Sequence, residues 1–427
     1  MFCAALMIVF VDPILFPDSA SYLSFNPARS FGYPWVVNVF KFLFGGYYLN
    51  LLIGFQVFCI LSVSYWLAQE IRKITGADQS LQWIIFLLAL YPWGFSASLK
   101  WGVAVLTEPL TFCLAIPIFI LFLRLIKHYS HDTCACLLCF FGLSLAFRSQ
   151  MIFIEGPILL LSFYLMKFSR FREGAILLFS SFMVIVTVLL INTLNILWHG
   201  EKPEQVFALS HSLISAVYIM DSETLDKVES EQTKEILKPI YKKLSGRCLN
   251  LESFDNDDCG PIDKTHFLFS FDKIYYEVMQ PSIAQYVKDH QEFKGESIYK
   301  LLFTSLLTQE VVYQPIRFFG HYLKTMITFG LYGKYGLLGF LVLCCVTVIR
   351  WFYTRDRQSE WLAVCLLFHM SNVVFVVLFE PHHFRYIFYT EVPIVVTLLT
   401  FTLQGLYCMR SNKISTKALG LKKGAII

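Results

Sequence analysis

The sequence predicts an all-α polytopic membrane protein with about ten transmembrane helices and one large, mostly helical loop outside the membrane. Apolar residues make up 56% of the 427 residues and charged residues only 15%, whereas about a quarter of a soluble globular chain is charged. The mean hydropathy is +0.58, and the apolar runs are long and do not alternate with polar residues, which favours helices surrounded by lipid. The formal charge of +4 is small and does not indicate nucleic acid as a partner.

Ten apolar segments approach or reach the roughly 20 residues that cross about 30 Å of hydrocarbon. Two of them, 133–147 and 150–166, are short, which suggests a tilted or broken pair there. The predicted spans are 1–16, 47–68, 82–99, 104–126, 133–147, 150–166, 175–198, 322–349, 360–379 and 387–408.

The first segment is unusual because its apolar run is short and no basic residue precedes Asp12. A cleaved signal peptide normally carries a positive charge before its apolar run. We therefore expect a genuine first helix, either short or starting upstream, with Asp12 as a buried or interfacial charge near its end.

Basic residues are distributed unevenly between the connecting segments, and this predicts the orientation of the chain. With a cytoplasmic N-terminus, fifteen basic residues face the cytoplasm and five lie in the short outside segments, as the positive-inside rule requires. Both termini are therefore expected in the cytoplasm. The inside set is Arg72, Lys73, Arg124, Lys127, Lys167, Arg170, Arg172, Arg350, Arg355, Arg357, Arg410, Lys413, Lys417, Lys422 and Lys423, and the outside set is Arg29, Lys41, Lys100, Arg148 and Arg385.

The predicted spans and orientation divide the chain into four regions. These are an N-terminal transmembrane region at 1–198 with its first loop at 17–46, an extracytoplasmic module at 199–321, C-terminal transmembrane helices at 322–408, and a basic cytoplasmic tail at 409–427.

The extracytoplasmic module carries much of the acid of the chain and has helical periodicity. Its first stretch, 205–220, is expected to be amphipathic or re-entrant and to lie along the membrane interface. Cys248 and Cys259 lie eleven positions apart in the module, and an oxidising compartment would favour a disulfide between them. The chain has no N-x-[ST] sequon, which favours a bacterial inner membrane, with the endoplasmic reticulum membrane as the alternative.

Polar side chains from four non-adjacent loops share the predicted outside face. Arg148 and Arg385 could simply extend to lipid headgroups, Glu108 could offset a helix dipole, and Tyr22 could be an ordinary interfacial aromatic residue. These interpretations do not explain why acids and cations from four loops converge on one face. Such a set suits acid–base chemistry on a polar acceptor, with cations that hold a phosphate. Its members are Asp12, Asp18, Tyr22, Arg29, Tyr33, Lys100, Glu108, Arg148, Gln150, Glu155, His199, His211, Glu380, His382, His383, Arg385 and Tyr386.

Four stretches in this set resemble, in order, motifs of the GT-C-type membrane glycosyltransferases. PDSASYLSFNPARSFGYPW is similar to their first loop, LTEPLTF to the acidic motif of the second loop, AFRSQMIFIEGPILLL to an Arg-containing helix junction, and FRYIFYTEVPIVV to a late Arg-Tyr segment. The resemblance covers about the first 200 residues and the last 50. It is strongest to the protein O-mannosyltransferases and the lipid A aminoarabinose transferases, which often carry two adjacent acids in the first loop, whereas here Ser19 follows Asp18.

The resemblance implies a GT-C-like fold and a glycosyltransferase activity with the 17–46 loop as its catalytic loop. A sugar would move, with inversion, from a polyprenyl-phosphate donor to a protein, lipid or glycan acceptor at the extracytoplasmic face of the bilayer. No cofactor is implied and no metal ligand is assigned, although a divalent metal is left open. The implied roles are general base for Asp18, second acid for Glu108, donor phosphate binding for Arg385 with Arg148 or Lys100, and a substrate pocket lined by Tyr22, Tyr386 and His383.

Two other functions are compatible with the composition. One is a transporter or flippase of a lipid-linked or small anionic substrate. Such a protein would place its polar residues near the middle of the membrane in broken helices, whereas here they lie at one face. Transporters also often contain an internal repeat, and no repeat of hydropathy is evident in this sequence. A membrane scaffold acting through the 199–321 module would give the acids of the first two loops no role.

Overall fold

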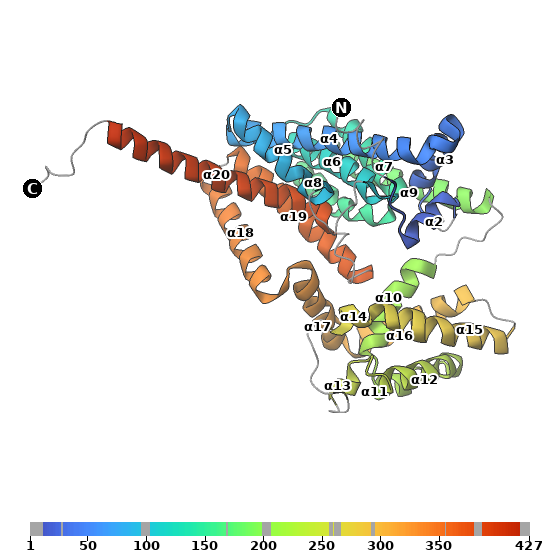
Figure 1. Cartoon of the computed structure of the whole chain (residues 1–427). Helices are drawn as coiled ribbons and strands as arrows, with labels where there is room; N and C mark the ends of the chain where they lie inside the picture. The colour runs from blue at the N-terminus through green and yellow to red at the C-terminus, as the bar shows by residue number, and fades with distance from the viewer. Residues whose placement is uncertain are drawn as a thin grey trace, which may run out of the picture. The chain divides into compact units, whose positions relative to one another are not determined.

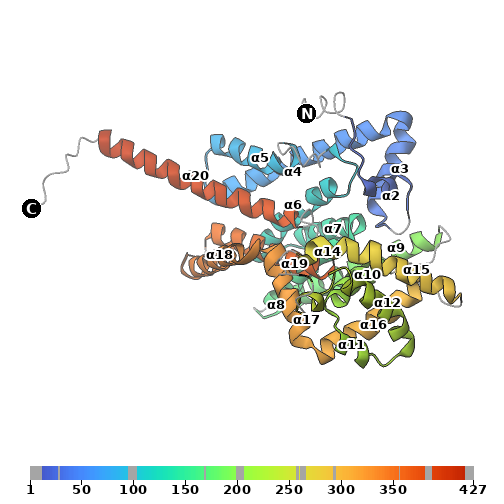
Figure 2. The ribbon, with the colours of Figure 1, turned by 60° about the horizontal axis from the view of Figure 1, so that its bottom comes forward.

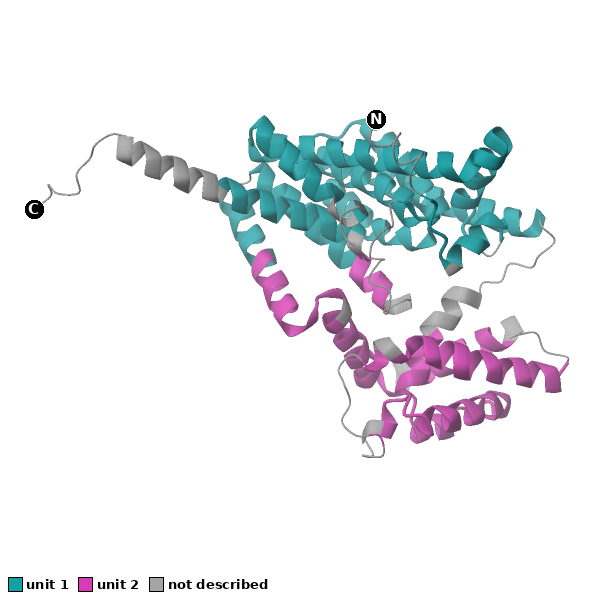
Figure 3. Ribbon diagram, viewed as in Figure 1, with its two compact units in different colours: residues 1–199, 344–371, 388–427 teal, residues 200–343, 372–387 magenta. Residues whose placement is uncertain are grey.

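The computed structural model is helical almost throughout the residues that it describes, which are 12–26, 29–94, 103–167, 170–198, 206–255, 259, 266–291, 295–354, 356–379 and 387–418 (Figure 1). Within these ranges no segment forms a β-strand, and Ile14 and Ala104 form an isolated β-bridge. The predicted all-α architecture is therefore confirmed. The chain divides into unit 1, with residues 1–199, 344–371 and 388–427, and unit 2, with residues 200–343 and 372–387 (Figure 3).

Unit 1 is built of long apolar helices joined by short connections. Its elements before residue 199 are α2 (Pro17–Leu23), α3 (Gly32–Phe44), the 3-10 turn Gly45–Tyr47, α4 (Tyr48–Thr75), α5 (Gln79–Gly94), α6 (Glu108–Lys127), α7 (His131–Phe147), the 3-10 turn Ser149–Ile154, α8 (Glu155–Lys167) and α9 (Phe171–Trp198). Its later elements are the second part of α18 (Gly333–Thr354), most of α19 (Arg357–Phe379) and α20 (Phe388–Ala418). Consecutive helices pack in pairs, α4 with α5, α6 with α7, and α8 with α9, and α20 lies along α5 (Figure 2).

Helix α6 lies at the centre of unit 1. It packs against α4, α7 and α20, and nearly all of its side chains are buried. The rings of Phe119 and Phe122 contact Phe368 of α19, with centroids 4.3 and 5.1 Å apart. A helix that is apolar on every side is stable only when it is surrounded on every side, and here α4, α7, α19 and α20 cover α6.

Six helical stretches among the described residues are long and apolar enough to cross a membrane. They are Gly32–Thr75, Glu108–Lys127, Ser149–Lys167, Phe171–Trp198, Gly333–Thr354 and Arg357–Val377, and two shorter apolar helices are Gln79–Leu90 and His131–Phe147. This agrees with a membrane protein.

The surface of unit 1 is strongly apolar on two helices, α9 and α18. Their most apolar stretches are only 17% and 6% buried, respectively. Large exposed side chains on these helices include Phe179, Phe182, Leu189, Val346 and Phe352. An apolar surface of this extent would be unstable in water and is typical of helices that face lipid.

The first predicted span is not helical where it is described. Residues 1–11 lie outside the described residues, while residues 12–16 are non-helical and Ile14 forms a β-bridge with Ala104. Asp12 is exposed in this segment and does not stand at the end of a helix, so the expectation that it would be buried at a helix end is wrong. Pro13 lacks a backbone N–H, and the residue before a proline disfavours helical geometry.

The predicted loop at 17–46 contains two helices, α2 and α3. Gly45, with φ at +55°, adopts the left-handed conformation that favours glycine and ends α3 before the chain turns into α4. The stretch Gly32–Thr75 is therefore two helices separated by a 3-10 turn. At about 1.5 Å per residue, the 13 residues of α3 are too short to cross the bilayer alone.

Two other predicted spans begin later than expected. The span predicted from residue 104 starts as α6 at Glu108, because residues 103–107 pair with the first segment of the chain instead. The span predicted from residue 322 starts as α18 at Gly333, after α17 (Pro315–Thr325), the π-helical turn Met326–Gly330 and a break. Apolarity alone does not distinguish these preceding segments from the membrane-spanning helices that follow them.

Unit 2 is also helical and has its own apolar core. Its elements are α10 (Val206–Ile219), α11 (Ser222–Lys227), α12 (Glu231–Ser245), α13 (Glu252–Asp255), α14 (His266–Asp272), the π-helical turn Lys273–Met279, α15 (Gln280–Asp289), α16 (Gly295–Tyr313), α17, the π-helical turn Met326–Gly330, the first part of α18 and the last part of α19. The apolar positions predicted from helical periodicity, such as Ile236, Leu237 and Ile240, are buried in its core.

Helix α10 occupies the core of unit 2. Leu213, Ile214 and the residues 216–220 are buried among side chains of α12, α14 and α16. The expectation that 205–220 lies along the membrane interface is therefore wrong for residues 213–220. The apolar face that suggested a lipid contact is covered by the module's own helices.

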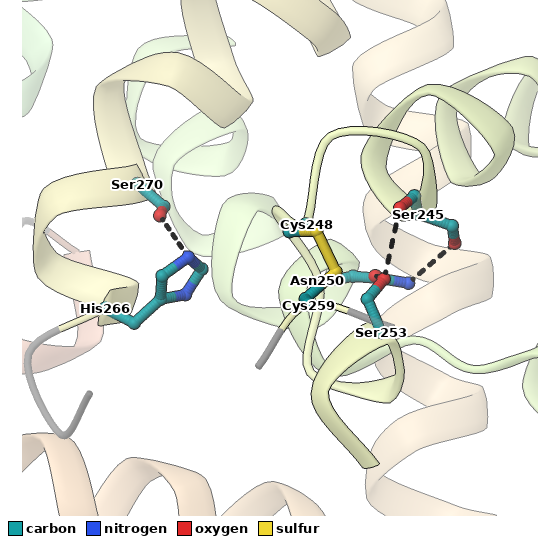
Figure 4. Close-up of a disulfide and its surroundings, with 7 residues drawn as sticks. All are labelled: Ser245, Cys248, Asn250, Ser253, Cys259, His266 and Ser270. Atoms are coloured by element: carbon teal, nitrogen blue, oxygen red, sulfur yellow. Dashed lines mark hydrogen bonds between the residues drawn. A yellow bond between two sulfur atoms is a disulfide. The ribbon is translucent and has the colours of Figure 1, made fainter. Parts of the chain in front are cut away.

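Cys248 and Cys259 form the predicted disulfide, with Cα atoms 5.7 Å apart (Figure 4). The bridge lies beside a small hydrogen-bonded cluster in which Asn250 Nδ2 donates to Ser245 Oγ over 3.1 Å and Ser253 Oγ donates to Asn250 Oδ1. Cys248 has a positive φ of +55° and the bridge ties it to residue 259. The disulfide therefore links the two ends of the segment 248–259.

Candidate functional site

Two segments that are far apart in the sequence lie side by side at one end of unit 1. The N–H of Ile14 donates to the carbonyl of Val103 over 3.1 Å, and the N–H of Val105 donates to the carbonyl of Ile14 over 3.0 Å. The buried Ser19 hydroxyl donates to the carbonyl of Val105 over 2.8 Å and accepts the N–H of Phe16. These bonds satisfy backbone groups that have no helical partner and hold α2 beside the N-terminus of α6.

Asp18 and Arg29 form the accessible part of this region. Asp18 lies in the first turn of α2, and Arg29 follows the end of that helix. Arg29 Nη2 donates to Asp18 Oδ1 over 2.8 Å, and Arg29 Nε donates to Ser21 Oγ over 3.0 Å. The Asp18 and Arg29 side chains are 29% and 32% exposed, so both are open to a ligand from outside the bundle.

Glu108 and Arg148 form a second, buried ion pair. Glu108 is the first residue of α6, and Arg148 directly follows α7. Arg148 Nη1 lies 3.0 Å from Glu108 Oε1 and donates to Thr107 Oγ1 over 3.0 Å, while Arg148 Nε donates to Gln150 Oε1 over 3.0 Å. The side chains are 2% exposed for Glu108 and 13% for Arg148. A charge that is buried this deeply requires a partner, so each residue stabilises the other.

Tyr22 joins the two ion pairs. Its buried phenol lies close to Thr107 and Arg148, and the guanidinium carbon of Arg29 lies 5.3 Å from the centroid of its ring, within cation–π range. Burial raises the pKa of Tyr22, while the nearby Arg148 acts in the opposite direction. The phenol is therefore neutral at physiological pH and can donate a hydrogen bond.

Tyr33 extends the network into the core of unit 1. Its ring meets that of Tyr22 edge to face, with centroids 5.2 Å apart, and its hydroxyl donates to Gln56 Oε1 over 2.8 Å. Gln56 Nε2 in turn donates to the carbonyl of Ala104 over 3.0 Å. These bonds connect α3, α4 and the segment before α6 through buried polar groups.

Gly32 allows α3 to begin against the end of α7. A Cβ atom at this position would lie 2.7 Å from the carbonyl oxygen of Ala146, closer than real contacts allow. Any other residue would separate α3 from α7 and displace Tyr33. The Gly-x-Pro element of the first-loop motif therefore has a packing explanation here.

The structure brings together four of the residues predicted for the site, and the other four lie outside the described residues. Asp18, Tyr22, Glu108 and Arg148 gather at one end of unit 1 from three separate segments. Lys100, His383, Arg385 and Tyr386 belong to the part of the chain that is not described.

Three residues of the network were given no role from the sequence. Arg29 stands in the same motif as Asp18, and its position eleven residues away gave no sign of the ion pair. Thr107 precedes Glu108-Pro109 at the N-cap of α6, which is a recognisable signal. Gln56 is a polar residue inside an apolar span, which is itself a reason to expect a function or a buried partner.

The arrangement can support proton transfer and phosphate binding. A part-exposed carboxylate and a part-exposed guanidinium lie in contact, and a buried ion pair with two tyrosines holds them in place. Among the described residues no group of three His, Cys, Asp or Glu side chains could hold a metal ion.

Comparisons with protein-family models, with curated proteins and with solved structures found no match to this chain.

Proposed function

We propose that this chain is a membrane glycosyltransferase of the GT-C type, which moves a sugar from a polyprenyl phosphate to an acceptor outside the cytoplasm. The observation that supports this most is the contact between Asp18, Arg29 and Tyr22 at one end of a set of helices long enough to cross a membrane. A polyprenyl donor cannot leave the bilayer, so an enzyme that uses it needs its polar site at the ends of its membrane helices.

The proposed reaction is a single displacement at the anomeric carbon. The nucleophilic group of the acceptor forms a bond to that carbon, and the bond from the carbon to the phosphate oxygen breaks with its electron pair remaining on the phosphate. Asp18 accepts the proton of the acceptor. A carboxylate can accept several hydrogen bonds, so the bond from Arg29 does not by itself prevent this role. The configuration at the anomeric carbon inverts.

A fixed cation is needed for the leaving phosphate. Arg29 is the guanidinium of the described cluster that is most exposed, and a guanidinium can bind two phosphate oxygens at once. We assign this role to Arg29 together with Arg385 and Lys100, which the motifs suggest. Arg148 and Glu108 then act as positioning residues, because they are buried against each other and against Thr107.

The remaining parts of the proposal concern topology. Ten spans, both termini in the cytoplasm and a bacterial inner membrane follow from the hydropathy and from the distribution of basic residues. The site end of unit 1 would then face the extracytoplasmic compartment. The disulfide of unit 2 supports an oxidising environment for that module.

The test uses the full-length chain reconstituted in vesicles. Polyprenyl phosphates that carry labelled mannose, glucose or aminoarabinose are supplied with a membrane extract from cells lacking the chain. We expect label to leave one of the donors and to appear on an acceptor, and Asp18→Asn to stop this. Movement of intact donor between leaflets without cleavage of the sugar–phosphate bond would instead show a flippase, and no turnover of any donor would reject the proposal.

A further inference from the structure

Unit 2 contains a surface pocket that the proposed function does not use. Its volume is about 510 Å³, within the range of small-molecule sites. Two helices supply its lining, which is Glu231, Gln232, Glu235, Lys238, Tyr286 and His290.

The sequence of α12 explains why its side chains point outward into this pocket. Residues 231, 232, 235 and 238 follow the spacing of one helix face, while Thr233, Ile236, Leu237 and Ile240 on the other face are buried. The pocket lies near the start of α12, where Ser230 caps the helix by accepting the N–H of Thr233.

Helix α15 lies antiparallel to α12 and forms the other wall. Lys243 Nζ near the end of α12 donates to Ser282 Oγ near the start of α15 over 3.0 Å. The start of α12 therefore faces the end of α15, where Tyr286 and His290 stand one helical turn apart. Their rings are stacked, with centroids 4.2 Å apart and an angle of 19° between the planes.

The polar groups of the pocket include both donors and acceptors. His290 Nδ1 lies 3.2 Å from the carbonyl oxygen of Tyr286, which can only accept, so Nδ1 donates in this contact. Lys238 supplies donors, and Gln232 supplies both kinds of group.

We propose that this pocket binds a neutral oligosaccharide. Sugar hydroxyls both donate and accept hydrogen bonds, which matches the mixed lining, and the C–H face of a sugar ring packs on aromatic rings such as Tyr286 and His290. Two carboxylates disfavour an anion, and Lys238 disfavours a simple cation. A metal is not indicated, because no described group of side chains could hold one. The site lies wholly within unit 2 and does not depend on the proposed reaction in unit 1.

The test measures saturation transfer by NMR from the full-length chain in nanodiscs to a soluble sugar. The probes are maltotriose, mannotriose and the trisaccharide of N-acetylglucosamine, each measured alone, with putrescine as a cationic probe. We expect transfer to at least one trisaccharide. Tyr286→Ala should weaken binding about tenfold, because it removes an aromatic contact.

Two further variants control the interpretation. Tyr276→Ala changes an exposed tyrosine of the same unit that does not line the pocket, and it should leave the sugar signal unchanged. Glu235→Ala removes an exposed acceptor of the pocket and should weaken binding even if Tyr286→Ala fails to fold. The proposal is overturned if no trisaccharide receives saturation, if putrescine alone does, or if the pocket variants bind sugar as the wild type does. The pocket variants change only unit 2, so their loss of sugar binding, with sugar transfer retained, separates this result from the reaction in unit 1.

Discussion

The two ends of unit 1 both contain ion pairs, but the pairs differ in burial. At the end away from the candidate site, Glu70 contacts Lys73 and Arg124 over 3.0 and 2.8 Å, and the two cations are 61% and 48% exposed. Lys127 and Glu360 form another pair there, 2.8 Å apart. These residues lie where the positive-inside pattern predicts the cytoplasm. Exposed cations of this kind orient a chain and contribute little to its stability.

At the site end, the ion pairs belong to a connected network. Glu108 is buried and Arg148 is largely covered, and Tyr22 lies between this pair and the accessible pair of Asp18 and Arg29. Burying two charges costs more than a surface pair returns, unless further hydrogen bonds satisfy them. The comparison indicates that the exposed cations at the opposite end help to orient the chain in the membrane. The buried ion pair at the site end is unfavourable to desolvate, and orientation alone does not require it.

The largest expected effect is that of Asp18→Asn on sugar transfer. Asparagine keeps the size and most hydrogen bonds of aspartate but does not accept the proton, and general base catalysis contributes roughly 10²–10⁴-fold. We expect turnover in the reconstituted vesicles to fall at least about a hundredfold, with donor affinity little changed. Asp12→Asn is the matched control, because Asp12 is an exposed aspartate of the same segment. If the control loses activity and Asp18→Asn does not, the base is misassigned.

The second effect compares the two ends directly through Glu108→Gln and Glu70→Gln. The first variant leaves Arg148 buried without its counter-charge, and breaking a buried pair costs about 3 kcal/mol or more. The second loosens pairs whose cations are exposed and should cost less than about 1 kcal/mol. Thermal unfolding in detergent measures both. Sugar transfer should fall moderately in Glu108→Gln and stay unchanged in Glu70→Gln. Equal losses of stability in the two variants would contradict the inferred difference in burial between the two ends.

The third prediction concerns the compartment in which unit 2 lies. Unit 2 follows α9 in the sequence, and its Cys248–Cys259 disulfide closes a short loop. On the chain-entropy model, its removal by Cys248→Ser with Cys259→Ser should cost about 3 kcal/mol. Alkylation of intact membranes, followed by mass spectrometry, should find both thiols protected until reduction. Alkylation of Cys248 and Cys259 without reductant would place the module in a reducing compartment.

The smallest effect is expected from Asp356, between α18 and α19. Burial alone would raise the pKa of Asp356, but hydrogen bonds from the Ser359 N–H and from Arg350 outweigh it and lower the pKa to about 2. Its ordinary value is 3.8, so the folded state favours the charged form. The stabilisation is present above about pH 4 and is lost as pH falls toward 2. Because the side chain is partly exposed, we expect about 1 kcal/mol.

The measurement for Asp356 is the difference in Tm between the wild type and Asp356→Asn. This difference should be visible at pH 6 and should shrink as pH falls toward 2, where the carboxylate of the folded wild type begins to be protonated. A difference that stays constant across this range would show that the carboxylate charge contributes nothing.

The apolar helices and several site residues could be predicted from sequence, but their boundaries could not. The hydropathy of α4, α7, α9 and α19 identified them, since their apolar runs are unbroken. The start of α6 was misplaced because residues 103–107 are as apolar as the helix and instead form backbone bonds to Ile14. Hydropathy reports how apolar a segment is, but it carries no information about which backbone groups pair with which.

Sequence by itself determined that the chain is helical and apolar enough for a membrane. It also identified Asp18, Tyr22, Glu108 and Arg148 as candidate site residues, because they are polar and lie between or beside apolar segments. These are properties of composition and local order. Only the tertiary structure decided that Arg29 pairs with Asp18, that Glu108 is buried against Arg148, and that Tyr22 contacts both pairs. The reason is physical: exposure and ion pairing depend on distances between segments up to about 130 residues apart, and these are set by how α2, α6 and α7 pack around Gly32 and Ser19.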